Sequence, residues 1–167
     1  MGTKRVGMAR VKSLINENVN QLKFKLPQVI RVSGTRTLTE GESGAKVYWT
    51  LGSTHHITLP DATVGMHFDF VIEKGADAAH TIISQSSDKI HGSYFLVKTG
   101  DKDKVSAQSV NHGSGVDKVH FQANGTATGG GAGSTCTLTC VEDGKWVATV
   151  HATTSGTPAS SVTGLAN

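Results

Sequence analysis

The stretch ITLPDATVGMHFDFVIEKG, residues Ile57–Gly75, contains the clearest fold signal in the chain. A short apolar run and a polar turn are followed by a run in which apolar and polar side chains alternate. Strict alternation is typical of a β-strand with one buried and one solvent-facing side. One side carries Met66, Phe68, Phe70 and Ile72, and the other carries His67, Asp69, Val71 and Glu73. The stretch therefore predicts a β-hairpin in which His67 lies outside the core, beside Asp69.

Runs of β-forming residues continue through most of the chain after residue 28. Turn signals rich in Gly, Asp, Asn and Ser separate most of these runs. Short strands at this spacing, without alternating helices, predict an all-β fold, either an antiparallel β-sandwich or a barrel-like body. The expected strands are Val29–Val32, Lys46–Leu51, His55–Leu59, Met66–Glu73, His80–Gln85, Lys89–Val97, Lys104–Val110, Lys118–Gln122, Thr135–Val141 and Lys145–His151.

The composition supports β-structure with many turns. Hydrophobic residues make up 37% of the chain and aromatic residues 5%, and there are 20 glycines. Thr and Val suit strands, whereas Gly and Asn suit tight turns. No apolar run approaches the roughly 20 residues of a membrane-spanning helix. The basic start MGTKR precedes a mixed amphipathic stretch, so we expect neither a membrane span nor a secretory signal.

Residues 5–23 are the one segment with a clear helical pattern. Apolar side chains recur there at spacings of three and four, and Pro27 predicts the end of the helix. An amphipathic helix this short needs a surface to pack on, which its own body, other copies or a partner can provide. The predicted contact residues of this arm are Arg5, Met8, Arg10, Val11, Lys12, Ile15, Val19 and Leu22.

The chain therefore divides into three predicted parts. Residues 1–27 form a basic N-terminal helical arm, residues 28–151 a β-rich body, and residues 152–167 a flexible or extended tail rich in Ser, Thr and Gly. The first 25 residues carry a net charge of +5 and the remainder −2. Such an arm suits an acidic protein face or nucleic acid, although a solvated helix end is the simpler interpretation. The glycine-rich segment Asn124–Ser134 is expected to be a long flexible loop.

The two cysteines are predicted to be buried free thiols. On a strand, Cys136, Leu138 and Cys140 share one face, and the two cysteines lie about 13 Å apart along it. A disulfide needs Cα atoms roughly 5.5 Å apart, so the pair cannot bridge without a sharp bend. Without a second Cys or a neighbouring His ligand, the pair is also a poor zinc site.

The eight histidines give little support to an enzyme. His55 and His56 are adjacent, so on a strand they face opposite sides and cannot hold one ion together. The others are scattered, and no HExxH helix, Walker loop or nucleophile elbow is present. A His–Asp pair such as His67 and Asp69 is more often a pair of solvated surface side chains than part of a catalytic site. We expect no catalytic residue, cofactor or metal, although a site of three histidines from different strands stays open.

A family resemblance adds to these patterns. The order TLTEGESG, ITLPDATVGMHFDFVIEKG, TIISQSSDKIHG and VEDGKWVATV resembles small virion structural proteins of tailed bacteriophages. The opening TKRVGMARVKSLINENVNQLK resembles the N-terminal arms of structural proteins from marine, cyanobacterial-type phages. The resemblance covers most of the chain and rests on the order of individually weak motifs. Head and tail locations are both compatible with it.

The resemblance implies a capsid decoration (cement) protein that binds the major capsid protein and stabilises the head. Such proteins are often homotrimers, lie on the capsid surface of the virion after assembly in the host cytoplasm, and have no catalytic residues. Nucleic acid and membranes are not expected partners. In this interpretation the arm contacts the capsid; the alternative is that the helix covers its own β-body.

A carbohydrate-binding β-sandwich used for host adhesion is the alternative function. Such a module holds a glycan with surface aromatic side chains and with Asp and Asn residues in loops. Tyr48 and Trp49 are adjacent and face opposite sides of a strand, so one of them is predicted to face solvent or an interface. Trp146 is predicted to belong to the core. With few aromatic residues in the chain, this alternative has less support.

Overall fold

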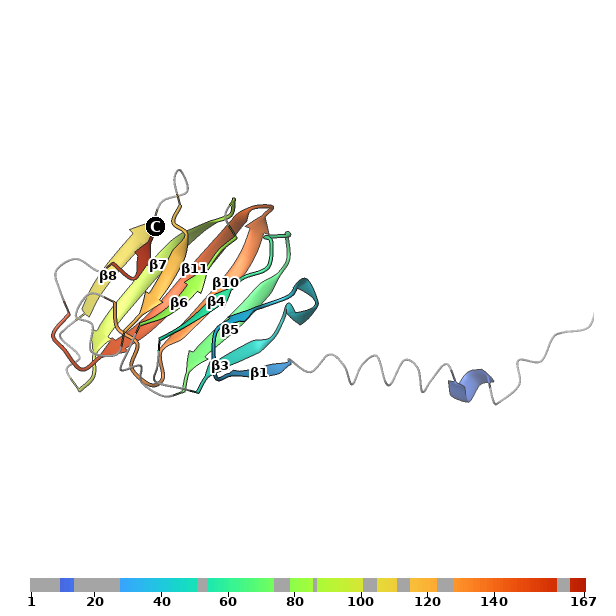
Figure 1. The fold of residues 1–167 in the computed structure, drawn as a ribbon, viewed down its shortest axis with the longest axis horizontal. Helices are drawn as coiled ribbons and strands as arrows, with labels where there is room; N and C mark the ends of the chain where they lie inside the picture. Colours follow the sequence, from blue (N-terminus) through green and yellow to red (C-terminus); the bar gives the residue numbers. More distant parts are fainter. Residues whose placement is uncertain are drawn as a thin grey trace, which may run out of the picture.

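The protein is a two-layer β-structure, seen in a computed structural model (Figure 1). The described residues are 10–13, 28–50, 54–73, 79–85, 87–100, 105–110, 115–122, 128–158 and 163–167. Within these ranges residues 10–13 are helical, and a short 3-10 turn, η1 (Glu40–Glu42), joins two strands. No helix in the described part of the chain is long and apolar enough to cross a bilayer.

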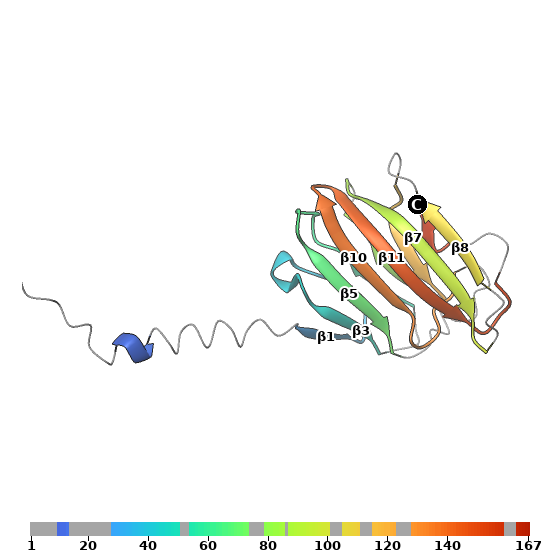
Figure 2. The same cartoon turned by 180° about the vertical axis from the view of Figure 1, so that it is seen from behind.

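The larger layer is a seven-stranded mixed sheet, which faces the viewer in Figure 2. Its order is β1-β3-β5-β10-β11-β7-β8. The strands are β1 (Val29–Val32), β3 (Lys46–Trp49), β5 (His67–Ile72), β10 (Thr135–Glu142), β11 (Lys145–Thr154), β7 (Lys89–Lys98) and β8 (Val105–Val110).

The smaller layer is a five-stranded mixed sheet with the order β12-β9-β6-β4-β2. Its strands are β12 (Leu165–Ala166), β9 (Lys118–Phe121), β6 (His80–Ile83), β4 (His55–Thr58) and β2 (Arg36–Thr37). All ten strands expected from the sequence are present, with ends within three residues of the expected ones. The two-residue strands β2 and β12 were not predicted, because two residues are too few to show alternation.

The expectation of an antiparallel body is wrong. From β1 to β7 the chain moves to the other sheet after every strand, so β1, β3 and β5 are parallel neighbours, as are β2, β4 and β6. β7 and β11 are also parallel. Parallel strands need a crossover connection, which is often a helix. Here a strand of the opposite sheet forms that crossover, so the absence of helices did not exclude parallel pairing.

The hairpin predicted for Ile57–Gly75 is wrong as well. β4 pairs with β2 and β6, whereas β5 pairs with β3 and β10. The connection between them crosses from one sheet to the other. There the Ala62 N–H donates to the buried carboxylate of Asp88 at 2.7 Å, and the Gly65 N–H donates to the Cys140 carbonyl at 3.0 Å. These bonds hold the connection between the two sheets in place.

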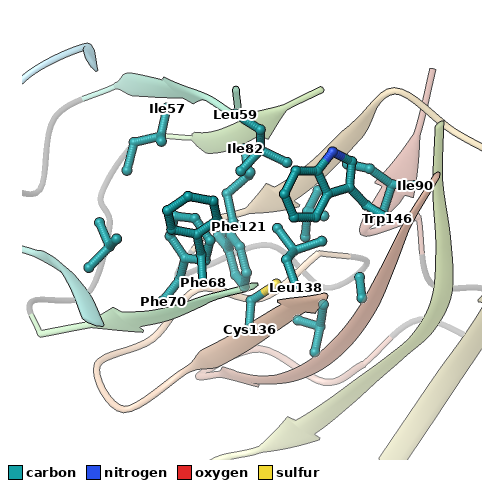
Figure 3. Close-up of a cluster of buried hydrophobic side chains, with 14 of the residues drawn as sticks. Ile57, Leu59, Phe68, Phe70, Ile82, Ile90, Phe121, Cys136, Leu138 and Trp146 are labelled. Carbon is teal, nitrogen blue, oxygen red and sulfur yellow. The ribbon is translucent and has the colours of Figure 1, made fainter. Parts of the chain in front are cut away.

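The alternation along β5 is confirmed. Phe68, Phe70 and Ile72 are buried, while His67 is exposed and Asp69 lies on the same outer side. Figure 3 shows Phe68 and Phe70 among side chains from both sheets, which together form one apolar core. The labelled members also include Ile57, Leu59, Ile82, Ile90, Phe121, Cys136, Leu138 and Trp146.

Three other predictions about buried groups are confirmed. Trp146 and Trp49 are fully buried, and Tyr48 lies half-buried on the opposite side of β3 beneath the guanidinium of Arg31, 5.6 Å from its ring centre. Both cysteines are free and buried, on the inner face of β10.

The described parts of the predicted loop and tail are attached to the body. The Gly130 and Gly131 N–H groups both donate to the Thr153 carbonyl at 2.9 Å. β11 continues to Thr154, three residues beyond its expected end. At the C-terminus β12 pairs with β9, and the Gln108 side chain bonds both the N–H and the carbonyl of Leu165. The C-terminal strand is thus part of the five-stranded sheet.

Candidate functional site

The arm chosen from the sequence as the contact element is described only at residues 10–13. Arg10, Val11 and Lys12 lie in this helical turn and are exposed, Val11 at 39%. The predicted contact residues Arg5, Met8, Ile15, Val19 and Leu22 lie outside the described residues. Their arrangement on one helix face therefore stays a prediction.

The outer face of the seven-stranded sheet is an exposed surface with a regular pattern. Along β10, Thr135, Thr137 and Thr139 are exposed and alternate with buried residues. β11 continues the same face with Val147 and Thr149. No Asp, Glu, Lys or Arg occurs in residues 135–141 or 146–154. The two central strands thus present small hydroxyl and apolar groups with very little charge.

Exposed apolar side chains are concentrated on this outer face. Five of the seven large apolar residues that are exposed in the described ranges lie there, namely Val29, Phe95, Val105, Val141 and Val147. The Phe95 ring stacks on the His151 imidazole, with ring centres 5.5 Å apart. Exposed apolar groups around uncharged central strands match the charge-depleted centre of a protein–protein interface.

A shallow hollow of about 240 Å³ lies on the same face, over β3, β5 and β10. Lys46 and Asp69 line it from neighbouring positions in the register of β3 and β5. The Thr137 hydroxyl donates to the Asp69 carboxylate at 3.0 Å, and the rest of the lining comes from Phe70, Val71 and Thr135. The hollow offers a carboxylate, an ammonium and hydroxyl groups, which are suitable partners for hydroxyl-rich ligands.

His67 and Asp69 belong to no metal cluster in the structure. Within the described ranges, no group of three or more His, Cys, Asp or Glu side chains is placed to hold an ion. The His67 ring lies near Gly44. The backbone N–H of His67 donates to the Ser43 hydroxyl, and its backbone carbonyl accepts from the Gly44 N–H. The backbone of His67 therefore helps to fix the turn before β3.

Pairing in the small sheet separates the adjacent histidines as predicted. His55 lies opposite His80 on the inner side, where the His80 ring stacks on Trp49 with centres 4.8 Å apart. His56 lies on the outer side, opposite Thr81, and Thr81 lies opposite His120. No sequence pattern indicates this grouping, because His56 and His120 belong to strands far apart in the chain, and the register between those strands depends on the fold.

Comparisons with known proteins give no relative. No protein-family model matches the chain, and neither a curated protein nor a solved structure is detectably similar to it.

Proposed function

We propose that this chain is a structural protein of a tailed-phage virion, a capsid decoration protein that binds the major capsid protein and stabilises the head. The observation that supports it most is the outer face of the seven-stranded sheet. Its central strands carry uncharged Thr and Val side chains, and exposed valines extend to both edges of the sheet. The motif resemblance supports the same class of protein.

In this proposal the outer face docks on the capsid lattice. Burying its apolar side chains contributes about 25 cal/mol for each Å² removed from water. Because the contact exists only in the assembled head, its whole binding free energy stabilises the assembly over separate subunits. Arg10 and Lys12, both exposed, add attraction to an acidic capsid surface, in keeping with the predicted role of the arm.

Co-assembly tests the proposal. The full chain is expressed with the major capsid protein encoded by the same genome, and assembled heads are separated on a sucrose gradient. We expect the chain to migrate with the heads and Val147→Lys to reduce its occupancy at least tenfold. The control Thr37→Lys adds the same charge at an exposed position of the other sheet and should bind normally. A chain that stays at the top of the gradient contradicts the proposal.

The contribution of the arm is measured in the same assay. The double variant Arg10→Glu and Lys12→Glu reverses two exposed charges without touching the β-body. Weaker head binding that becomes equal to wild type at high salt supports an electrostatic contact by the arm. Unchanged binding at low salt assigns docking to the sheet face alone.

Carbohydrate binding is the second candidate, favoured by the hollow between Lys46 and Asp69. A carboxylate beside an ammonium can accept and donate hydrogen bonds to neighbouring sugar hydroxyls. A glycan array with the full chain tests this function. Binding that is lost in Asp69→Asn but kept in Val147→Lys supports adhesion through the hollow, and an array without signal rejects it.

A further inference from the structure

Two histidines and a threonine form a row across three strands of the five-stranded sheet. His56 on β4 pairs with Thr81 on β6, and Thr81 pairs with His120 on β9. Their neighbours His80 and Phe121 are buried inside the sandwich, so the side chains of the row lie on the outer face. The Cα atoms of the two histidines are two strand spacings apart, about 10 Å.

The side chains of the row are in close contact. The Thr81 hydroxyl lies 3.2 Å from Nδ1 of His120. Thr81 is only 3% exposed although it faces outward, so its neighbours close over it. Nδ1 of His56 is buried and has no hydrogen-bond partner among the described residues. One imidazole is therefore oriented by a hydroxyl, and the other lies on the opposite side of Thr81 with a nitrogen that has no partner among the described residues.

The contact with Thr81 can also set which nitrogen of His120 carries the proton. A neutral imidazole has a lone pair available on one nitrogen, as metal coordination requires. If Nδ1 of His120 donates its proton to Thr81, the lone pair is on Nε2, in the way that hydrogen-bonded histidines are oriented at metal centres.

We propose that His56 and His120 bind one divalent transition-metal ion on the outer face of the five-stranded sheet, with Thr81 as the positioning residue. Imidazole suits Cu²⁺, Zn²⁺ and Ni²⁺ and does not suit Mg²⁺ or Ca²⁺, which prefer oxygen. With two protein ligands, the ion keeps water at its other positions, as open sites do. The site lies on the sheet opposite the docking face, so it is independent of the proposed function.

The affinity of this site for a metal ion is limited by its small number of ligands and by a neighbouring positive charge. The described residues supply no third His, Cys, Asp or Glu near the row, and the ammonium of Lys118 repels a cation. Binding is therefore weaker than at a four-ligand structural zinc site. The affinity order follows the general preference of nitrogen sites, with Cu²⁺ above Zn²⁺.

Titration calorimetry of the full chain with Zn²⁺ and Cu²⁺ tests the site. We expect one ion per chain and at least a tenfold loss of affinity in both His56→Gln and His120→Gln. The control His67→Gln removes an exposed histidine from the other sheet and should bind as wild type does. Thr81→Val keeps both ligands and should cause a smaller loss. Unchanged affinity in His120→Gln, or an equal loss in His67→Gln, overturns the proposal.

A second measurement uses the wild-type chain and does not depend on the folding of a variant. In NMR spectra of the histidine ring protons, substoichiometric Cu²⁺ should broaden the signals of His56 and His120 first. His67 and His151 lie on the outer face of the other sheet and should keep sharp signals. Uniform broadening of all histidines, or broadening confined to His67 or His151, overturns the site.

Discussion

Gly92 allows a close backbone approach between two strands of the larger sheet. It lies on β7 opposite Ala148 of β11, and its φ of 131° is rarely adopted by residues with side chains. A Cβ atom built at Gly92 would be 1.9 Å from the Ala148 carbonyl oxygen, which is backbone and cannot rotate away. The two longest strands of the sheet therefore meet at a position that tolerates only glycine.

Gly92→Ala should destabilise the protein by about 3 kcal/mol, because overpacking and an unfavourable φ act together. Urea unfolding followed by tryptophan fluorescence measures the change in the free energy of unfolding. The matched control is Gly41→Ala, since a Cβ at Gly41 meets no atom within 4 Å. If Gly92→Ala is as stable as Gly41→Ala, β7 and β11 can move apart at Gly92 without lowering the free energy of unfolding.

Cys136 and Tyr94 should make stability fall at alkaline pH. Burial raises the pKa of the Cys136 thiol, and burial raises that of the Tyr94 hydroxyl as well. The folded protein keeps these protons after the unfolded chain has lost them, which starts near pH 8.5 for Cys and 10 for Tyr. The contribution of the two groups to the free energy of unfolding is fully present below the pKa values of the unfolded chain. It is lost progressively as pH rises above those values.

The measurement is the free energy of unfolding between pH 8 and 11, with reductant present. Each such group contributes a slope of at most about 1.4 kcal/mol per pH unit. Cys136→Ala should therefore show a shallower decline than wild type, whatever the cost of the small cavity it leaves. Identical slopes would mean that the thiol ionises equally in both states.

At the level of the element, alternation predicted which side chains are buried but not which strands are neighbours. Trp146, Phe68 and His67 have the burial that their position in an alternating run indicates. The partner of a strand depends on its connections, and the PDATVG segment between β4 and β5 is compatible with either a reversal or a crossing. The buried Asp88, which bonds this segment, belongs to a distant part of the chain. The grouping of His56 with His120 could not be predicted either, because it depends on which strands are neighbours.

β12 is held by an unusual contact with the side chain of Gln108. The Gln108 amide donates to the Leu165 carbonyl at 2.9 Å and accepts from the Leu165 N–H at 3.0 Å. Because Gln108 belongs to β8 of the larger sheet and Leu165 to the smaller one, this contact joins the two layers at one edge. It adds to the backbone pairing of this two-residue strand with β9.

Gln108→Ala should release β12 from β9. The lost pair of hydrogen bonds corresponds to about 1–2 kcal/mol, or about a tenfold increase in local opening. Hydrogen exchange at the His120 amide is the readout, because this N–H donates to the Gly164 carbonyl and is not itself bonded to Gln108. Ser109→Ala, at an exposed neighbouring position, is the control. Unchanged exchange at His120 would mean that β12 does not need the Gln108 contact.

At the level of the whole molecule, both edges of the seven-stranded sheet are exposed. β1 and β8 form these edges and carry Val29 at 58% and Val105 at 54% exposure. An edge strand has unpaired N–H and carbonyl groups that another chain can bond, and closed assemblies cover such edges. This arrangement supports the homotrimer implied by the family resemblance.

Light scattering of the full chain should therefore give three times the 17.5-kDa mass of one chain. The trimer should survive removal of residues 1–27, since the β-body carries the edges, and Val105→Lys should weaken it because the new charge would be buried between copies. Thr37→Lys, exposed in the smaller sheet, is the charge-matched control. A trimer that forms only with residues 1–27 makes the arm the assembly element and argues against its proposed contact with the capsid. A monomer under all conditions contradicts the trimer and weakens the decoration proposal relative to carbohydrate binding.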